Sequence, residues 1–117
     1  MIHNVMASEA KTAPGHWSVF GRTVFEGGGV SVRHNLILAG GGAQAHRHDF
    51  EHIFFVLRGS LHVTCGGKTT VVPAGCAFRF EPGEQHQVCG DGVSDAEYLT
   101  INVPALQTAP DDGGKGA

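Results

Sequence analysis

The sequence predicts an all-β protein with a single domain, in which short strands close on themselves as a sandwich or a jelly-roll barrel. At 117 residues the chain can form one hydrophobic core but not two. Its apolar residues come in short runs rich in β-branched and aromatic side chains, and no run keeps helical periodicity over three turns. Eighteen glycines are spread along the chain, as expected where tight turns join many strands.

About eight strands are expected within residues 17–106, which should form the folded domain. Turn signals separate them, such as GGG at 27–29, GGGA at 40–43 and EPGE at 81–84. Residues 1–16 are an N-terminal segment that could serve as an interface strand, and residues 107–117 (QTAPDDGGKGA) are expected to be a disordered tail. In chain order, the expected strands are 17–26, 30–39, 53–59, 60–65, 69–75, 76–80, 86–92 and 96–103.

The charge pattern excludes two classes of partner. The formal net charge is −3 and the eight Lys and Arg residues are scattered, so we expect neither nucleic acid nor an anionic membrane as a partner. No signal-peptide pattern opens the chain and no apolar run approaches membrane-spanning length, which favours a cytoplasmic location. The cysteines are odd in number and widely spaced, so we expect buried free thiols at Cys65, Cys76 and Cys89 rather than disulfides or a zinc knuckle.

Histidine is the unusual component of this sequence. There are eight, and three fall within seven positions, at His46, His48 and His52. If this segment is extended, the three side chains share one parity and point to one face. Imidazoles packed together without a cation leave ring nitrogens unsatisfied and repel one another when protonated, so the cluster indicates a metal site. His86 follows the turn EPGE and could reach the same site from the next strand. The other histidines lack such neighbours and are expected to be structural: His3, His16, His34 and His62.

Strand parity also suggests residues that could line a pocket beside the metal. Tyr98, Thr100 and Asn102 share one face of the run 96–103, a face that could be turned to a pocket or to solvent. Arg33 and Asn35 share a face of an earlier strand, where Arg33 could bind a substrate carboxylate or enolate or else lie at the surface. Two acidic residues lie near the motif histidines, Glu51 and Glu81. Either could orient a metal ligand or act as a base, or both could simply be solvated charges.

Two segments resemble the sequence motifs of the cupin superfamily. Residues 40–59 (GGGAQAHRHDFEHIFFVLRG) resemble the first motif, G-x5-HxH-x3-E-x6-G, with every spacing kept. Residues 75–86 (GCAFRFEPGEQH) resemble the second, G-x5-PxG-x2-H, with Glu81 in place of the proline, and Gly90 stands where an asparagine is usual. His52 occupies the position of the glutamate. The sequence is therefore most similar to small monodomain bacterial cupins whose metal, typically manganese, is bound by four histidines.

This resemblance implies a double-stranded β-helix barrel, usually a homodimer, with a divalent metal deep in the bowl. It assigns the ligand role to His46, His48, His52 and His86, with manganese or iron expected. Zinc, nickel or copper could replace them, because neutral imidazoles tolerate several ions. The resemblance also places the aromatic position of Tyr98 near the metal, so Tyr98 and Arg33 are the candidate catalytic residues. Residues 1–25 are a candidate interface or swapped strand of the dimer.

Three functions fit such a site. A histidine-only site leaves the ion its full charge, and four ligands on an octahedral ion leave two adjacent positions for a small organic substrate and oxygen. We therefore expect a dioxygenase-type oxidoreductase acting on a small enol, aromatic or alkene. The alternatives are a non-redox Lewis-acid isomerase, cyclase or lyase and a non-catalytic small-molecule binding protein. Four ligands on tetrahedral zinc would instead close a structural site.

Overall fold

The computed structural model describes residues 2, 4, 9–48 and 51–104. The described residues form strands and turns and include no helix. Among them there is accordingly no helix long and apolar enough to cross a membrane. The expected tail, residues 107–117, lies outside the described residues, as do His3 and most of the first eight residues. The strands are β1 (His16–Gly27), β2 (Val30–Ala43), β3 (Glu51–Arg58), β4 (Ser60–Cys65), β5 (Lys68–Pro73), β6 (Ala77–Phe80), β7 (His86–Gly90) and β8 (Ala96–Val103).

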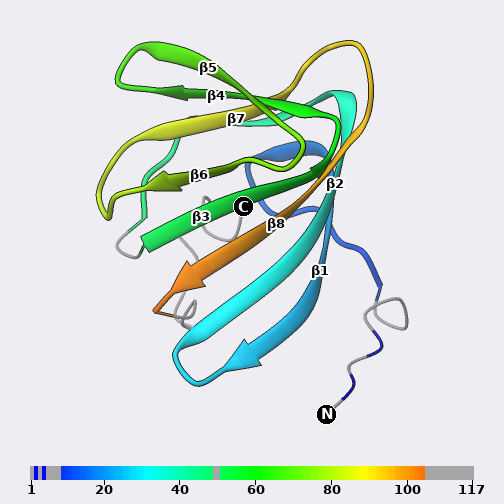
Figure 1. The fold of residues 1–117 in the computed structure, drawn as a ribbon, viewed down its shortest axis with the longest axis vertical. Helices are drawn as coiled ribbons and strands as arrows, with labels where there is room; N and C mark the ends of the chain where they lie inside the picture. Colours follow the sequence, from blue (N-terminus) through cyan, green and yellow to red (C-terminus); the bar gives the residue numbers. More distant parts are fainter. Residues whose placement is uncertain (1, 3, 5–8, 49–50, 105–117) are drawn as a thin grey trace.

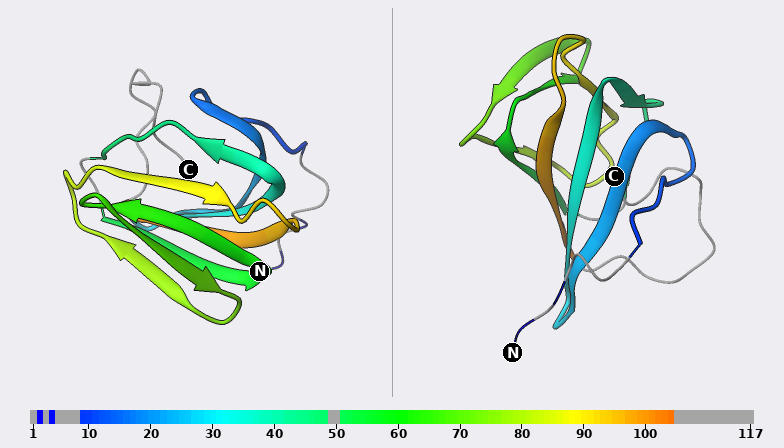
Figure 2. Two further views of the ribbon diagram at one scale, coloured as in Figure 1. Left: turned by 90° about the horizontal axis from the view of Figure 1, so that it is seen from above. Right: turned by 90° about the vertical axis from the view of Figure 1, so that its right-hand side faces the viewer.

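The eight strands form a nearly closed barrel, so the all-β jelly-roll prediction is confirmed. Hydrogen bonds join them in the order β5-β4-β7-β2-β8-β3-β6, and β1 pairs with β2. Figures 1 and 2 show the sheet curling so that β4, β5 and β7 face β3 and β8 across the interior, while the β1–β2 hairpin extends to one side. The long strand β2 belongs to both walls, because it pairs with β8 along its first half and with β7 at Gly42.

The core occupies the interior of this barrel. Along β8, residues Ala96, Tyr98, Thr100 and Asn102 are buried and alternate with half-buried neighbours. This period of two is the signature of a strand with one face turned inward. The buried residues of this face change from Ala96 and Tyr98 at the start of β8 to the polar Thr100 and Asn102 toward its end. The fully buried apolar residues include Ile37, Phe54, Val56, Leu61, Val63 and Phe80.

The sequence GGGA at 40–43 was predicted to be a turn, and this prediction was wrong. Strand β2 continues through it to Ala43. A Cβ on Gly41 would lie 2.6 Å from the Ser18 carbonyl oxygen, and one on Gly42 would lie 2.9 Å from the Trp17 ring. These glycines allow strand β1 to pack closely against β2, so they serve a close approach of backbones rather than a change of direction.

Candidate metal centre

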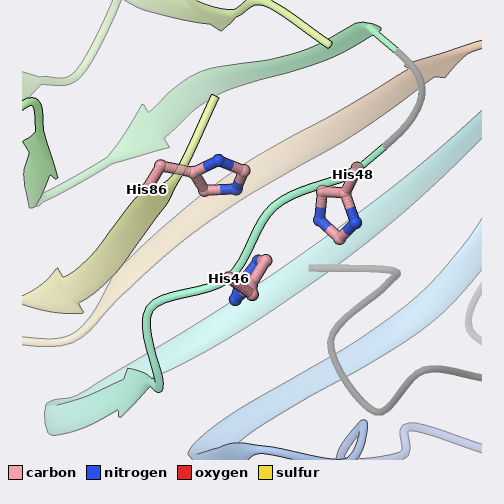
Figure 3. A group of neighbouring side chains, drawn as sticks. All are labelled: His46, His48 and His86. Carbon is pink, nitrogen blue, oxygen red and sulfur yellow. The ribbon is translucent and has the colours of Figure 1, made fainter. Parts of the chain in front are cut away.

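Three histidines meet inside the barrel. His46 and His48 lie on the segment between β2 and β3, and His86 is the first residue of β7. Each offers a ring nitrogen, and these nitrogens all lie within 4.8 Å of one another. The ring centroid of His46 is 4.7 Å from the ring centroid of His48 and 4.6 Å from that of His86. Figure 3 shows the three rings gathered from two chain segments around a common space.

The route by which the chain brings these histidines together differs from the prediction. The parity argument held only if residues 46–52 were extended, whereas strand β3 begins at Glu51, two residues before the expected start at 53. His46 instead forms an isolated bridge with His86, through backbone N–H to carbonyl bonds of 2.9 and 2.8 Å. This bridge places both side chains beside each other directly. His48 is 4 % exposed while the adjacent Arg47 faces solvent, so the inward and outward alternation still holds there.

Two of the rings are held so that one nitrogen can bind a cation. Nδ1 of His46 donates to the Gln44 carbonyl at 2.7 Å, and Nδ1 of His86 donates to the Glu84 carbonyl at 3.1 Å. A carbonyl oxygen only accepts, so each ring carries its proton on Nδ1 and a lone pair on Nε2. Both Nε2 atoms are buried and have no hydrogen-bond partner among the described residues. Buried nitrogens of this kind fit a divalent ion, which would take both lone pairs.

His52 lies beside these three histidines but does not belong to the group whose ring nitrogens are all within 4.8 Å of one another. Its ring centroid is 4.8 Å from that of His48 and 5.4 Å from that of His86, and its side chain is fully buried. Nδ1 of His52 donates to the side-chain oxygen of Asn102, which leaves its lone pair on Nε2. The carboxylates of the described residues contribute nothing to the cluster, so the site there consists of imidazoles.

Aromatic side chains close the space behind the histidines. The Phe80 ring stacks on His86 with centroids 3.9 Å apart and planes 15° apart, and Phe54 meets the His52 ring edge-on at 4.7 Å. Burial in this apolar setting, together with repulsion from His46, lowers the pKa of His86 to about 4. The imidazole is therefore neutral at physiological pH, which is the form that binds metals.

The polar face of β8 is turned inward, which decides between the two alternatives for Tyr98, Thr100 and Asn102. All three are essentially buried. The Tyr98 ring stacks on Phe54 at 5.1 Å, and it lines a small pocket together with His46. Burial raises the pKa of the Tyr98 hydroxyl, and the nearby charge of Arg33 only partly offsets this. Tyr98 therefore stays protonated and can act as a hydrogen-bond donor at the wall of the site.

Arg33 belongs to the inner face of β2 rather than to the surface. Its register partner on β8 is Thr100, and the neighbouring inward residue Asn35 donates to the Thr100 hydroxyl at 2.7 Å. Arg33 Nε is buried without a hydrogen-bond partner among the described residues. Burial lowers the pKa of Arg33, while Tyr98 and Glu26 act in the opposite direction. Arg33 is thus a half-buried cation on the same inner wall as Tyr98.

The two acidic residues considered at the sequence level pair with an arginine and do not belong to the group of clustered histidines. Glu51 and Glu81 both pair with Arg79 on the outside of the barrel, where the side chain of Glu81 is 62 % exposed. Their role as orienting partners or bases is therefore not supported. Asn102 instead accepts a hydrogen bond from His52, a contact that strand parity did not identify although it had placed Asn102 on the inward face.

The cysteines differ from one another. All three are free thiols, in agreement with the sequence, but Cys76 is exposed and Cys65 and Cys89 are half-buried, so the prediction of buried thiols was wrong for Cys76. Burial and the Glu84 carboxylate raise the pKa of Cys65 to about 11.

Sequence reasoning missed His16, which we had expected to be structural. It lies at the start of β1, paired in register with Ala43, and its ring centroid is 5.8 Å from that of His46. Burial and repulsion from His46 lower its pKa, although a hydrogen bond to the Pro14 carbonyl opposes them. No short-range sequence pattern predicts the proximity of His16 to His46, because the two residues are thirty positions apart and meet only through the pairing of β1 with β2.

An all-β jelly-roll barrel with histidines converging inside it defines the cupin class of protein. The chain belongs to the cupin domain family (Cupin_2), which matches residues 33–102. That match spans β2 to β8 almost completely, and it includes the three clustered histidines. No match was found among curated proteins.

Solved structures share this fold at low sequence identity. An RmlC-like cupin from Shewanella frigidimarina superposes with a TM-score of 0.79 at 17 % identity, covering 91 % of this chain and 92 % of the other. The polyketide cyclase RemF from Streptomyces resistomycificus gives 0.80 at 18 % identity, covering 97 % and 88 %. A predicted oxalate decarboxylase from Thermotoga maritima gives 0.77 at 17 % identity, covering 89 % and 99 %. These likenesses establish the fold, which hosts different activities.

Proposed function

We propose that this protein is a metal-dependent enzyme that binds a small organic substrate at a divalent ion held by histidines alone. The observation that carries the proposal is the pair of buried Nε2 atoms of His46 and His86, each left with a lone pair by an Nδ1 to carbonyl bond. His48 and His52 would complete a set of four ligands, as in the manganese-type cupins that the sequence resembles. Manganese or iron is the proposed ion, with zinc, nickel or copper as substitutes.

The proposed reaction is of the dioxygenase type, on an enol, an aromatic compound or an alkene. The ion would supply a positive centre at which substrate and oxygen meet. The residues of this chain would bind and orient the substrate beside it: Phe54 and Phe80 exclude water, and Tyr98 donates a hydrogen bond. These three side chains are at most 1 % exposed, so a substrate there is shielded from solvent.

Lewis-acid isomerisation, cyclisation or ring opening without oxygen is the second candidate. It is favoured by Arg33, a half-buried cation on the same wall as Tyr98, because such a group can bind the anionic oxygen of an enolate or carboxylate. The fold neighbours include a polyketide cyclase, which supports keeping this reaction class.

One experiment separates the two reactions. The protein is loaded with manganese, iron or zinc, metal content is measured by elemental analysis, and oxygen uptake is followed with enol, thiol and alkene substrates. Oxygen consumption with manganese or iron, absent with zinc, is expected for the dioxygenase. Turnover that is unchanged without oxygen and supported by zinc would identify the Lewis-acid enzyme. Tight small-molecule binding without turnover would identify a binding protein.

Assembly as a homodimer and a cytoplasmic location are proposed on the family resemblance. Sedimentation at micromolar concentration tests the first, and a monomer there would contradict it.

A further inference from the structure

Three basic residues that are scattered in the sequence meet at one pocket of the folded chain. The pocket has a volume of about 410 Å³ and is lined by Glu9, Lys11, Gly21, Arg22, Thr23 and Arg33. Backbone hydrogen bonds of 3.0 and 2.8 Å join Lys11 to Gly21 of β1. In the same strand, Thr23 pairs with Arg33 of β2. Strand pairing therefore concentrates positive charge here, although the net charge of the protein is −3.

Arg33 is a half-buried cation at this pocket, and it forms no ion pair within the described part of the chain. Its Nε is buried without a hydrogen-bond partner among the described residues. Its two terminal nitrogens also have no such partner there but are not buried, so a ligand in the pocket can reach them. The guanidinium lies over Gly21, where a Cβ would come within 2.7 Å of Nη2, so the missing side chain makes room for it. A cation that is partly removed from water favours an anion beside it.

We infer that this pocket binds a small oxyanion that carries two negative charges, such as a phosphate group. Three basic residues and one acidic residue line it, which leaves an excess of two positive charges. The terminal nitrogens of Arg33 donate two parallel hydrogen bonds to oxygens of the anion, and Lys11 adds a point charge. The volume leaves room for a small organic group on the phosphate. None of the clustered histidines lines the pocket, so this site goes beyond the proposed function and requires no metal.

The test is the binding of inorganic phosphate, measured by calorimetry at constant ionic strength. The protein is first treated with a chelator, because phosphate also coordinates metal ions. Wild type is expected to bind phosphate saturably and to bind acetate, which has one charge, several times more weakly. Arg33→Gln should weaken phosphate binding about tenfold or more, as hydrogen bonds to a charged group contribute. Lys11→Gln should weaken it about twofold to fivefold, as expected for an exposed charge.

Two further variants separate a built site from general attraction by charge. Gly21→Ala keeps every charge, but its Cβ displaces the guanidinium of Arg33, so phosphate binding should weaken here as well. Lys68→Gln removes one positive charge from β5 and should leave the affinity for phosphate unaltered. Lys11→Gln decides the question if Arg33→Gln does not fold, because Lys11 is exposed and its bridge to Gly21 uses backbone atoms alone.

Three results would overturn the inference. The first is the absence of saturable phosphate binding to wild type. The second is an equal loss of affinity in Lys68→Gln and Lys11→Gln, as general attraction by charge would give. The third is phosphate binding that appears only in the metal-loaded protein, which would place the anion at the histidines. Failure of the wild type to bind any metal would contradict the proposed function and leave the inference about this pocket unaffected.

Discussion

The side-chain oxygen of Asn102 accepts a hydrogen bond from Nδ1 of His52, which links β8 to β3 inside the barrel. The amide of Asn102 is itself oriented, because its Nδ2 donates to the Ser31 hydroxyl at 3.3 Å. Three residues from three strands thus fix the tautomer of one histidine. In metal sites, such a partner sets the orientation and basicity of the ligand.

Replacing Asn102 should therefore weaken metal binding although Asn102 is not itself a proposed ligand. Asn102→Leu removes the acceptor, and we expect the dissociation constant for zinc to rise about 10- to 100-fold. Asn102→Asp keeps an acceptor at the same place and should retain most of the affinity. Competition with a chelating dye measures both. Equal affinities for the two variants would contradict the role given to Asn102.

Removal of a clustered histidine should eliminate the stabilisation that metal gives. A ligand that binds only the folded state raises the free energy of unfolding by about 2.7 kcal/mol at a hundred times its dissociation constant. We expect added manganese or zinc to raise the melting temperature of wild type but not of His46→Ala or His86→Ala. His62→Ala, a change in β4 away from the cluster, is the matched control and should respond like wild type.

A His52→Glu exchange tests the position that departs from the common cupin motif. A carboxylate lowers the positive charge of the site and adds an oxygen ligand, so the protein should still bind metal while its relative affinities for manganese and zinc change. The ratio of the two dissociation constants is the measurement. Loss of all metal would show that His52 has been assigned the wrong role.

The glycines at the end of β2 give a stability prediction with a control one residue away. A Cβ at Gly41 would lie 2.6 Å from a backbone oxygen, whereas one at Gly40 meets nothing within 4 Å. Gly41→Ala should lower the free energy of unfolding by about 1–3 kcal/mol, as overpacked sites do, and Gly40→Ala should change it little. Urea unfolding of both variants provides the comparison, and equal midpoints would be inconsistent with the close packing of β1 on β2.

Asp91 should make stability depend on acid pH. Its carboxylate accepts hydrogen bonds from the backbone of Ser94 and Val93 and from the Ser60 hydroxyl, which lowers its pKa from 3.8 to about 2. Between these values the unfolded chain binds more protons, so the stabilisation is complete above pH 3.8 and is lost as the pH falls toward 2. Asp91→Asn should flatten the pH dependence of the melting temperature in this window. An unchanged slope would argue against these hydrogen bonds.

Much of the fold could be predicted because its signals are local. The bounds of β4 and β8 agree with the runs of alternating residues, and the burial of Tyr98, Thr100 and Asn102 follows their common parity. The extension of β2 through Gly41 could not be predicted in this way. Glycine suits both a turn and a close approach of two backbones, and which of these applies depends on Ser18, a residue far away in the sequence.

The sequence by itself determined the barrel class, the family motifs and the candidate ligands His46, His48, His52 and His86, because side-chain type and spacing are written along the chain. Only the tertiary structure decided which atoms meet. The His46–His86 bridge, the acceptor that Asn102 provides for His52 and the approach of His16 to the cluster all join residues thirty or more positions apart. Strand pairing creates such contacts, and a one-residue shift in register would turn each of these side chains to the opposite face.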